Sequence, residues 1–398
     1  MYSEVLHFIR SVFHEPEEFI PLHAPYFGGN EKKYLADTID STFVSSVGAY
    51  VNRFEEMMCA ITGARYAIAT TNGTIALHLA LVVAGVKPGE EVITQPLTFV
   101  ATANAISHAN GIPVFVDVDR DTMGMSPEAL RAFLEAHAEM SGGFAVNKHT
   151  GRRIAACVPM HTFGFPCRIE KIAAICTQWN IPLVEDAAES LGSYSNGRHT
   201  GTFGLAGVFS FNGNKTVTCG GGGALVTNDP GLAERAKHLS TTAKVPHAYE
   251  FVHDEVGYNY RMPNLNAALA CAQLEQLPEI LANKRDLAAQ YGRYFSGSGN
   301  FTFVSELPGT NANYWLNTIV LENAAVRDEL LQVSNAAKVM TRPIWQLMNK
   351  LPMYSQCMRG PLENALWLEE RVVNIPSSYR PHASVALPSN AGTAENTN

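Results

Sequence analysis

This sequence lacks the features that mark membrane, secreted and nucleic-acid-binding proteins. No apolar run approaches the roughly 18 residues that a membrane-spanning helix needs. The first stretch, MYSEVLHFIRSVFHEPEEF, mixes acidic with apolar residues and has no small-residue cleavage site, which argues against a signal peptide. The chain has 29 basic residues and 37 acidic ones. The resulting formal net charge of −8 disfavours nucleic acid or an anionic membrane as the main partner. An anionic ligand therefore needs a local basic pocket.

Cysteine usage excludes two further classes of protein. The seven cysteines are scattered and none of them forms a C-x-x-C pair. Neither a disulfide framework nor a zinc site is expected from this pattern, and we predict no metal. The cysteines instead indicate buried or incidental thiols in a reducing compartment, so we expect a cytoplasmic protein.

The chain is long enough for two or three domains, and its pattern changes along its length. The first 240 or so of its 398 residues alternate helical segments with short apolar strands such as GEEVITQPL and GIPVFVDVD. This alternation predicts an α/β fold with a doubly wound, mostly parallel sheet covered on both faces, which we assign to residues 1–245 together with the amino-terminal segment.

The remaining residues predict a second, smaller domain. Residues 264–295 keep helical periodicity throughout, so we expect one long helix that bridges the domains. Residues 246–380 are assigned to this helix and a small carboxy-terminal α+β domain. The last residues, 381–398, are small and polar, and we expect them to be disordered.

Chemistry-bearing residues follow four of the predicted strands, at the sheet edge where α/β proteins bind ligands. Asn72-Gly73-Thr74 opens an apolar helix whose free N–H groups suit a phosphate. Phe99, Asp186 and the Ser210–Lys215 segment follow the other three strands. A phosphate cradle, an aromatic ring, a carboxylate and an amine together match the needs of pyridoxal phosphate: Lys215 forms the Schiff base and Asp186 pairs with the pyridinium nitrogen. The glycines at 220–223 are expected to let the backbone pack closely beside the lysine.

Other readings of these residues are weaker. The run GGGG in FSFNGNKTVTCGGGG matches neither the Walker pattern nor G-x-G-x-x-G, which argues against a kinase or a Rossmann dehydrogenase. A lysine-dependent aldolase has no use for the phosphate cradle. A non-enzymatic protein on the same scaffold would show a defective site, and no residue of this set is missing.

Six motifs resemble the DegT/DnrJ/StrS sugar aminotransferases over about residues 20–380. They are NGTIALHLAL, GEEVITQPLTFVATANAI, PVFVDVD, VEDAAESLG, GTFGLAGVFSFNGNKTVTCGGGGALVTND and GYNYRMPNLNAALACAQLEQL. The resemblance implies a fold-type I pyridoxal phosphate enzyme that acts on nucleotide-linked keto sugars. Within this family, FIPLHAPYFGGNEKKY, STFVSSVG, PMHTFGFPCRIE and VMTRPIW resemble the legionaminic acid branch.

The resemblance also implies roles for individual residues. Phe99 stacks on the cofactor ring, Ser210 donates to its phosphate, and Asn259 reaches that phosphate from the neighbouring subunit. Glu189 departs from the family pattern, where His or Gln is common. Residues expected to contact substrate are Glu189, His161, Arg261, Tyr314, Trp315 and Arg342. The alternative for the GYNYRMPN loop is that it caps the following helix within its own chain, with Asn264 as the N-cap.

These observations predict an aminotransferase that moves an amino group from L-glutamate to C4 of a UDP- or GDP-linked 2-acetamido-4-keto-2,6-dideoxyhexose. The product would serve legionaminic acid or bacillosamine-type glycans. We expect ping-pong kinetics, since both substrates use one site in turn, and a homodimer with shared active sites. The alternatives are an aminotransferase for a perosamine-type keto sugar, or a pyridoxamine phosphate-dependent sugar dehydratase, which Lys215 disfavours.

Overall fold

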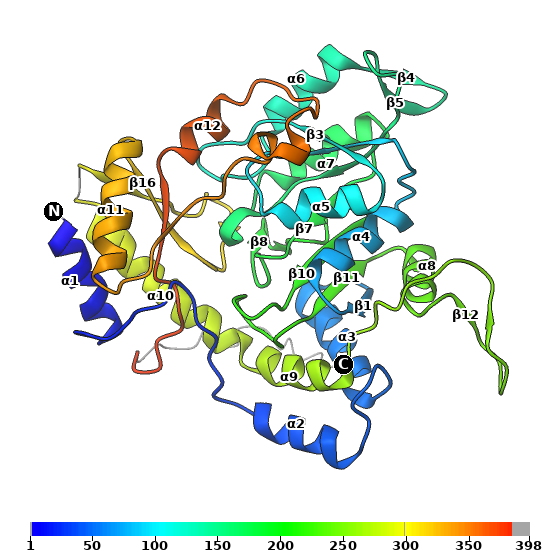
Figure 1. The fold of residues 1–398 in the computed structure, drawn as a ribbon, viewed down its shortest axis with the longest axis horizontal. Helices are drawn as coiled ribbons and strands as arrows, with labels where there is room; N and C mark the ends of the chain where they lie inside the picture. The colour runs from blue at the N-terminus through cyan, green and yellow to red at the C-terminus, as the bar shows by residue number, and fades with distance from the viewer. Residues whose placement is uncertain (1, 298, 384–398) are drawn as a thin grey trace, which may run out of the picture.

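The computed structural model describes residues 2–297 and 299–383, so most of the predicted tail, residues 384–398, lies outside the described part. A large sheet flanked by helices occupies one side of the molecule and a smaller sheet with its own helices occupies the other (Figure 1). None of the helices in the described ranges combines the length and apolar character that a membrane span requires.

The large sheet has the strand order β3-β2-β6-β7-β10-β11-β1. Two hydrogen-bonded groups, β3-β2-β6 and β7-β10-β11-β1, meet where isolated parallel bridges join the β6 and β7 segments. Every pair is parallel except those of β11, which runs antiparallel to both β10 and β1. The strands are β1 (Tyr66–Thr70), β2 (Glu91–Thr94), β3 (Ile112–Phe115), β6 (Ile154–Val158), β7 (Val184–Asp186), β10 (Ala206–Ser210) and β11 (Gly223–Thr227). The predicted α/β fold with a mostly parallel sheet is confirmed.

Alternate residues of the strands are buried on opposite faces of this sheet. Ile68, Val208 and Leu225 pack in a cluster with α4 and α8, whereas Ala67 and Ala224 pack in a cluster with α3 and α9. Because both faces are covered, the strands read as continuous apolar runs rather than as alternating ones. These helices are α3 (Ala49–Thr62), α4 (Gly73–Val83), α8 (Pro230–Ser240) and α9 (Asn264–Glu275).

The other end of the sheet is covered by α5 (Val100–His108), α6 (Pro127–His137) and α7 (Ile169–Gln178). Helix α6 begins as its sequence indicates. The Ser126 hydroxyl accepts a hydrogen bond from the Ala129 N–H at 3.3 Å, and Pro127 occupies the first turn, where a missing N–H costs nothing.

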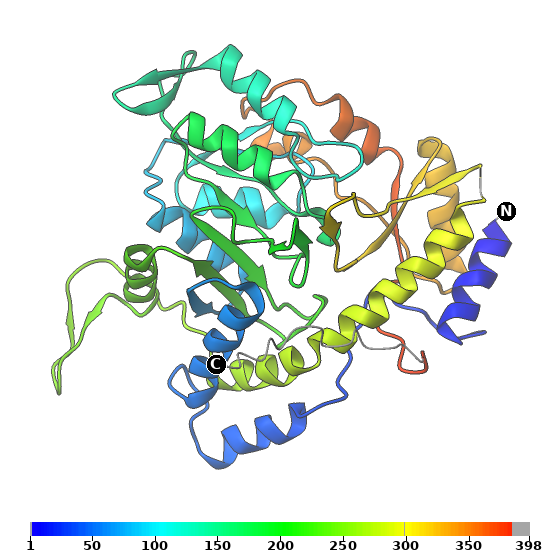
Figure 2. The same cartoon turned by 180° about the vertical axis from the view of Figure 1, so that it is seen from behind.

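The predicted single bridging helix is two helices. Helix α9 ends at Glu275, and α10 (Leu277–Phe295) starts anew with Pro278 in its first turn. Proline cannot sit inside a helix without breaking a backbone hydrogen bond and clashing with the preceding turn, which explains the break. Helix α9 packs on the large sheet, and α10 continues into the smaller part of the molecule (Figure 2).

The smaller part is built on the antiparallel sheet β14-β16-β18-β17. The amino-terminal helix α1 packs here rather than on the large sheet, because Val5 and Ile9 share a buried cluster with Leu287 and Leu330. The boundary at residue 245 stays a prediction. Elements of this part are α1 (Tyr2–Phe13), α11 (Ala324–Ala336), α12 (Glu363–Glu369), β14 (Phe301–Phe303), β16 (Asn317–Leu321), β17 (Arg342–Pro343) and β18 (Val372–Ile375).

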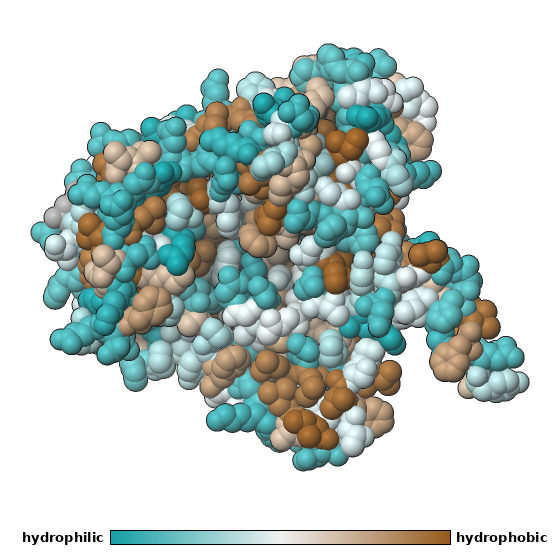
Figure 3. Space-filling model, viewed as in Figure 1, coloured by the Kyte–Doolittle hydropathy of each residue, from teal (hydrophilic) through white to brown (hydrophobic). Residues whose placement is uncertain are grey.

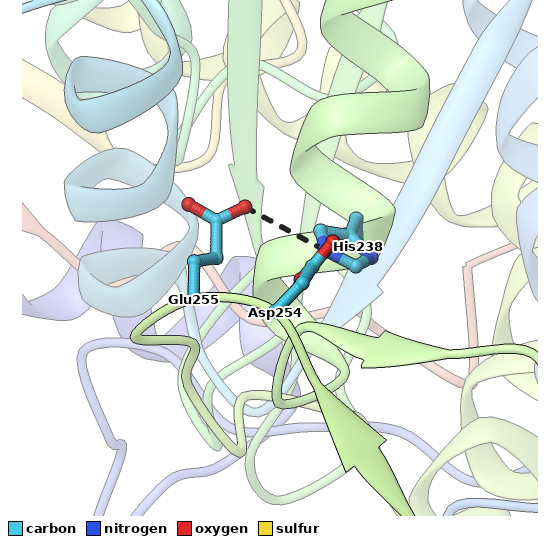
Figure 4. A group of neighbouring side chains, drawn as sticks. All are labelled: His238, Asp254 and Glu255. Atoms are coloured by element: carbon cyan, nitrogen blue, oxygen red, sulfur yellow. Dashed lines mark hydrogen bonds and ion pairs between the residues drawn. The ribbon is translucent and has the colours of Figure 1, made fainter.

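An arm formed by β12 (Lys244–Val245) and β13 (Val252–His253) projects from the large part (Figure 1). At its base, His238 Nε2 on α8 lies 2.8 Å from Asp254 Oδ1 and 3.5 Å from Glu255 Oε1 (Figure 4). Glu255 also forms an ion pair with Arg235. Remaining elements are α2 (Glu31–Asp40), β4 (Ala138–Ser141), β5 (Phe144–Asn147), β8 (Tyr194–Ser195), β9 (Arg198–His199), β15 (Thr310–Asn311) and the 3₁₀ turns Thr162–Gly164, Met348–Lys350 and Pro352–Tyr354.

Candidate active site

A cavity of about 550 Å³ opens at the carboxyl ends of the strands of the large sheet. Most of the residues singled out from the sequence line it. The predicted residues that line it are Asn72, Gly73, Thr74, Phe99, Asp186, Glu189, Ser210, Lys215 and Trp315. Asn214 and Trp345 line it as well, although the sequence alone did not single them out.

The amino terminus of α4 forms one wall of this cavity. Asn72 caps the helix, its side chain accepting from the Ile75 N–H at 2.9 Å, while the first N–H groups of a helix have no partner within it. Those groups and the helix dipole favour an anion at this point. A Cβ built on Gly73 would lie 2.8 Å from the Cβ of Ser210, so only glycine leaves room there. The cradle therefore fits a phosphate group.

Lys215 lies in the loop between β10 and β11. Its Nζ is 3.1 Å from Glu189 Oε1 and 3.9 Å from the ring centroid of Trp315. Burial raises the pKa of Glu189 to about 7, although the ammonium of Lys215 and the N–H of Phe163 act to lower it. The lysine thus has one carboxylate partner and one aromatic face beside it.

Asp186 ends β7 and is buried at the floor of the cavity. Its Oδ2 accepts from the Thr102 hydroxyl at 2.7 Å, and its Oδ1 accepts from the Ala188 N–H at 3.2 Å. Burial raises the pKa of Asp186, while these two donors hold the carboxylate in place. Thr102 lies on α5 within one of the stretches quoted above, but the sequence alone assigns it no role, and its contact with Asp186 comes from the fold.

The glycines at 220–223 were expected to let the backbone pack closely beside Lys215, and the structure shows other close contacts for them. Gly223 starts β11, and a Cβ there would overlap the Asn72 backbone. The glycine therefore lets β11 pass beside the phosphate-cradle turn rather than beside Lys215. Gly220 has φ +77°, a conformation that favours glycine in the same loop.

His161, which the sequence predicts to contact substrate, does not line the cavity. His161 is fully buried behind the cavity, with its Nε2 3.0 Å from Glu185 Oε2 and its Nδ1 accepting from the Cys167 N–H at 3.3 Å. Glu185 also accepts from the Gly201 N–H at 2.7 Å. His161 thus contacts the carboxylate that holds the loop after β9, and a substrate role for His161 stays a prediction.

Tyr314 and Arg342 do not line the cavity either. The Tyr314 hydroxyl accepts from the Glu306 N–H at 3.3 Å, and its ring packs against Phe165. Arg342 is exposed on β17 and donates to Asn335 Oδ1 at 2.8 Å. A substrate role for either residue stays a prediction.

The loop that contains Asn259 and Arg261 faces a different groove. Arg261 lines a space of about 500 Å³ beside Phe43 and Val47, and its guanidinium donates to Asn259 Oδ1 at 3.3 Å. Asn264 does not cap α9: its side chain accepts from the Tyr50 N–H and donates to the Phe43 carbonyl, and Pro263 occupies the N-cap position.

Comparison with known proteins agrees with this site. The DegT/DnrJ/EryC1/StrS aminotransferase family matches residues 25–382. GDP-perosamine synthase of Escherichia coli O157:H7 is 35% identical over 90% of this chain and 93% of its own, and GDP-perosamine synthase of Vibrio cholerae is 35% identical over 90% and 94%. The crystal structure of the aminotransferase TlmJ from Streptoalloteichus hindustanus superposes with a TM-score of 0.83 at 26% identity, covering 92% of this chain and 95% of TlmJ.

The family depends on pyridoxal phosphate, and the phosphate cradle, Asp186 and Lys215 fit that cofactor. The chain therefore belongs to the DegT/DnrJ/EryC1/StrS aminotransferase family, with the fold type I architecture and the pyridoxal phosphate cofactor of its members.

Proposed function

We propose that this protein transfers an amino group from L-glutamate to C4 of a nucleotide-linked 4-keto-6-deoxy sugar. The observation that carries the proposal is the convergence of Lys215, Asp186 and the Gly73 cradle on one cavity. The motifs quoted above favour a 2-acetamido sugar on the route to legionaminic acid or bacillosamine-type glycans. The 35% identity to two GDP-perosamine synthases favours a GDP-linked sugar of perosamine type instead.

Each site residue has a role in this reaction. Bound pyridoxal phosphate supplies an electron sink for the carbon that loses a proton. Asp186 pairs with the ring nitrogen and keeps it protonated. Lys215 would hold the cofactor covalently through Nζ and, when its amine is free, would carry the proton as general base and acid. Phe99 offers a ring face, and Ser210 with the start of α4 binds the phosphate.

A direct test uses the purified protein with L-glutamate and a panel of UDP- and GDP-linked 4-keto sugars, with the products identified by mass. Borohydride reduction before digestion should fix the cofactor on the peptide that contains Lys215. Lys215→Ala should lose both turnover and fixation, whereas Lys350→Ala, which removes a surface lysine paired with Glu369, should keep both. Turnover by Lys215→Ala within tenfold of wild type would refute the assignment. The preferred sugar decides between the two substrate proposals.

We further propose that the active unit is a homodimer whose sites are shared. The cradle at Gly73 and Ser210 offers neutral donors, although a phosphate carries close to two negative charges. Arg261 is the cation that could complete it, yet it lines a separate groove of its own chain. Apolar side chains gather over the region of α2 beside that groove, and Phe43 and Val47 are 58% and 65% exposed (Figure 3). A two-fold axis at this surface would deliver the Arg261 loop to the partner's cradle.

Mixing two inactive variants tests shared sites. Lys215→Ala is combined with an Asn259→Ala, Arg261→Ala double variant under conditions that allow subunit exchange. Each heterodimer then pairs one intact lysine with one intact donated loop, so its activity should recover toward half that of the wild-type dimer. No recovery after verified exchange would place the loop in its own subunit's site or in none.

A further inference from the structure

A lysine is buried in the middle of helix α10, and the partners of its ammonium in the described part of the chain are two carbonyl oxygens. Lys284 is completely buried, and its Nζ donates to the carbonyls of Trp315 at 3.1 Å and Ser377 at 2.6 Å. In residues 2–297 and 299–383 no carboxylate lies within hydrogen-bond distance of this Nζ. Buried lysines are rare unless paired, because removing an ammonium from water is costly. Lys284 is therefore an unusual group for a helix interior.

The charged groups around Lys284 give it no compensation. Burial lowers the pKa of Lys284 to about 7. The pKa of His23 is also lowered, first by burial and then by the nearby Lys284 and Lys215. His23 Nδ1 is buried without a hydrogen-bond partner in the described part of the chain. His23 and Lys284 are thus two buried basic groups close to the lysine of the active site, with His23 near both lysines.

Trp315 connects Lys284 to that active-site lysine. Its carbonyl accepts from Lys284, its N–H donates to Asn313 Oδ1 at 2.8 Å, and its indole N–H donates to the Asn214 carbonyl at 2.7 Å. The indole face lies 3.9 Å from Lys215 Nζ. The tryptophan is thereby held at three points, and one of them is Lys284.

We propose that Lys284 is a positioning residue that fixes Trp315 over Lys215. Because its second acceptor, Ser377, follows β18, Lys284 also ties the small sheet to the indole. Ser377 in turn donates its N–H to the Leu22 carbonyl at 2.7 Å, so the amino-terminal segment is linked to Lys284 through Ser377. A shift of the small part of the molecule would reach the cofactor lysine through this contact. The inference rests on the proposed role of Lys215.

A double-mutant cycle tests the connection. Apo forms of wild type, Lys284→Met, Trp315→Phe and the double variant are titrated with pyridoxal phosphate, followed by absorbance and by circular dichroism of the bound cofactor. A cation over an aromatic ring gains an amount that corresponds to roughly 2- to 30-fold in affinity. We expect each single variant to weaken binding within that range and to change the dichroic band in the same direction. The double variant should be no weaker than Trp315→Phe.

The outcomes separate the inference from the proposed function. If the two losses multiply in the double variant and the dichroic band of Lys284→Met matches wild type, Lys284 serves stability only and the inference fails. If wild type fixes no cofactor on Lys215 after borohydride, the proposed function fails and the inference with it. Should Lys284→Met show no cooperative melting, Lys284→Gln, which keeps an N–H donor, replaces it in the same cycle. Lys350→Met, which removes a surface lysine paired with Glu369, should leave both readouts unchanged.

Discussion

Replacing Lys284 with methionine should change stability in a way that depends on pH. The pKa of Lys284 is lowered from 10.5 to about 7 because burial penalises the charged form. An unfolded lysine keeps its ordinary pKa, so between these two values the unfolded chain binds more protons than the folded one. Wild type therefore gains stability as the pH rises through this window, and it carries the full cost of the buried charge below it. Methionine has neither the charge nor the titration.

The magnitude follows from the size of the shift. One pKa unit corresponds to about 1.4 kcal/mol, so wild type should gain up to about 3 kcal/mol relative to Lys284→Met between pH 7 and pH 9.5. The variant also leaves the carbonyls of Trp315 and Ser377 without their donor, at about 1–3 kcal/mol each, and that cost does not change with pH. His23 does not interfere, because its lowered pKa keeps it neutral throughout this range.

Urea unfolding of both apo proteins at several pH values measures the difference. The free energy of unfolding of wild type minus that of the variant should rise steadily with pH, while titrations common to both proteins cancel. Parallel stability curves would refute the reasoning, since they would mean that Lys284 titrates alike in the folded and unfolded chains. A difference that falls with pH would mean that a buried anion pairs with the lysine.

Three further predictions concern the cavity. Asp186→Asn should keep the covalent cofactor but slow turnover roughly 10²–10³-fold, the range for a lost electrostatic contact to a reacting group, and normal kinetics would show that another residue contacts the ring nitrogen. The pKa of Glu189 is raised from 4.5 to about 7. Wild-type apo protein should therefore lose up to about 3 kcal/mol of stability relative to Glu189→Gln as the pH rises from 4.5 to 7. Equal dependence of the two unfolding free energies on pH, measured in urea, would contradict a buried carboxylate. Gly73→Ala brings a methyl group to within 2.8 Å of Ser210 and should cost about 1–3 kcal/mol of stability. The same methyl group should weaken cofactor binding, which absorbance titrations measure. Unchanged affinity for the cofactor would place its phosphate elsewhere.

Local patterns in the sequence predicted the elements and the position of the chemistry along the chain. Apolar runs bounded by turn residues identified the strands, and Ser126 with Pro127 identified the start of α6. Asp186 and Ser210 end their strands as expected, and parallel strands bring their carboxyl ends to one edge of a sheet. Where spacing dictates geometry, as it does within one strand or one helical turn, the sequence alone was sufficient.

Contacts between distant segments were decided only by the tertiary structure. Thr102 reaches Asp186, and Lys284 reaches Trp315, across separations that no local pattern encodes. His161 reads as a ligand contact after its strand, yet the packing around Glu185 encloses it. The physical reason is that helix and strand periods fix which face a side chain occupies, whereas burial and partners depend on which other element covers that face. The amino-acid sequence by itself determined the set of chemical groups and their order at the sheet edge, and three-dimensional packing decided which of them meet in the cavity.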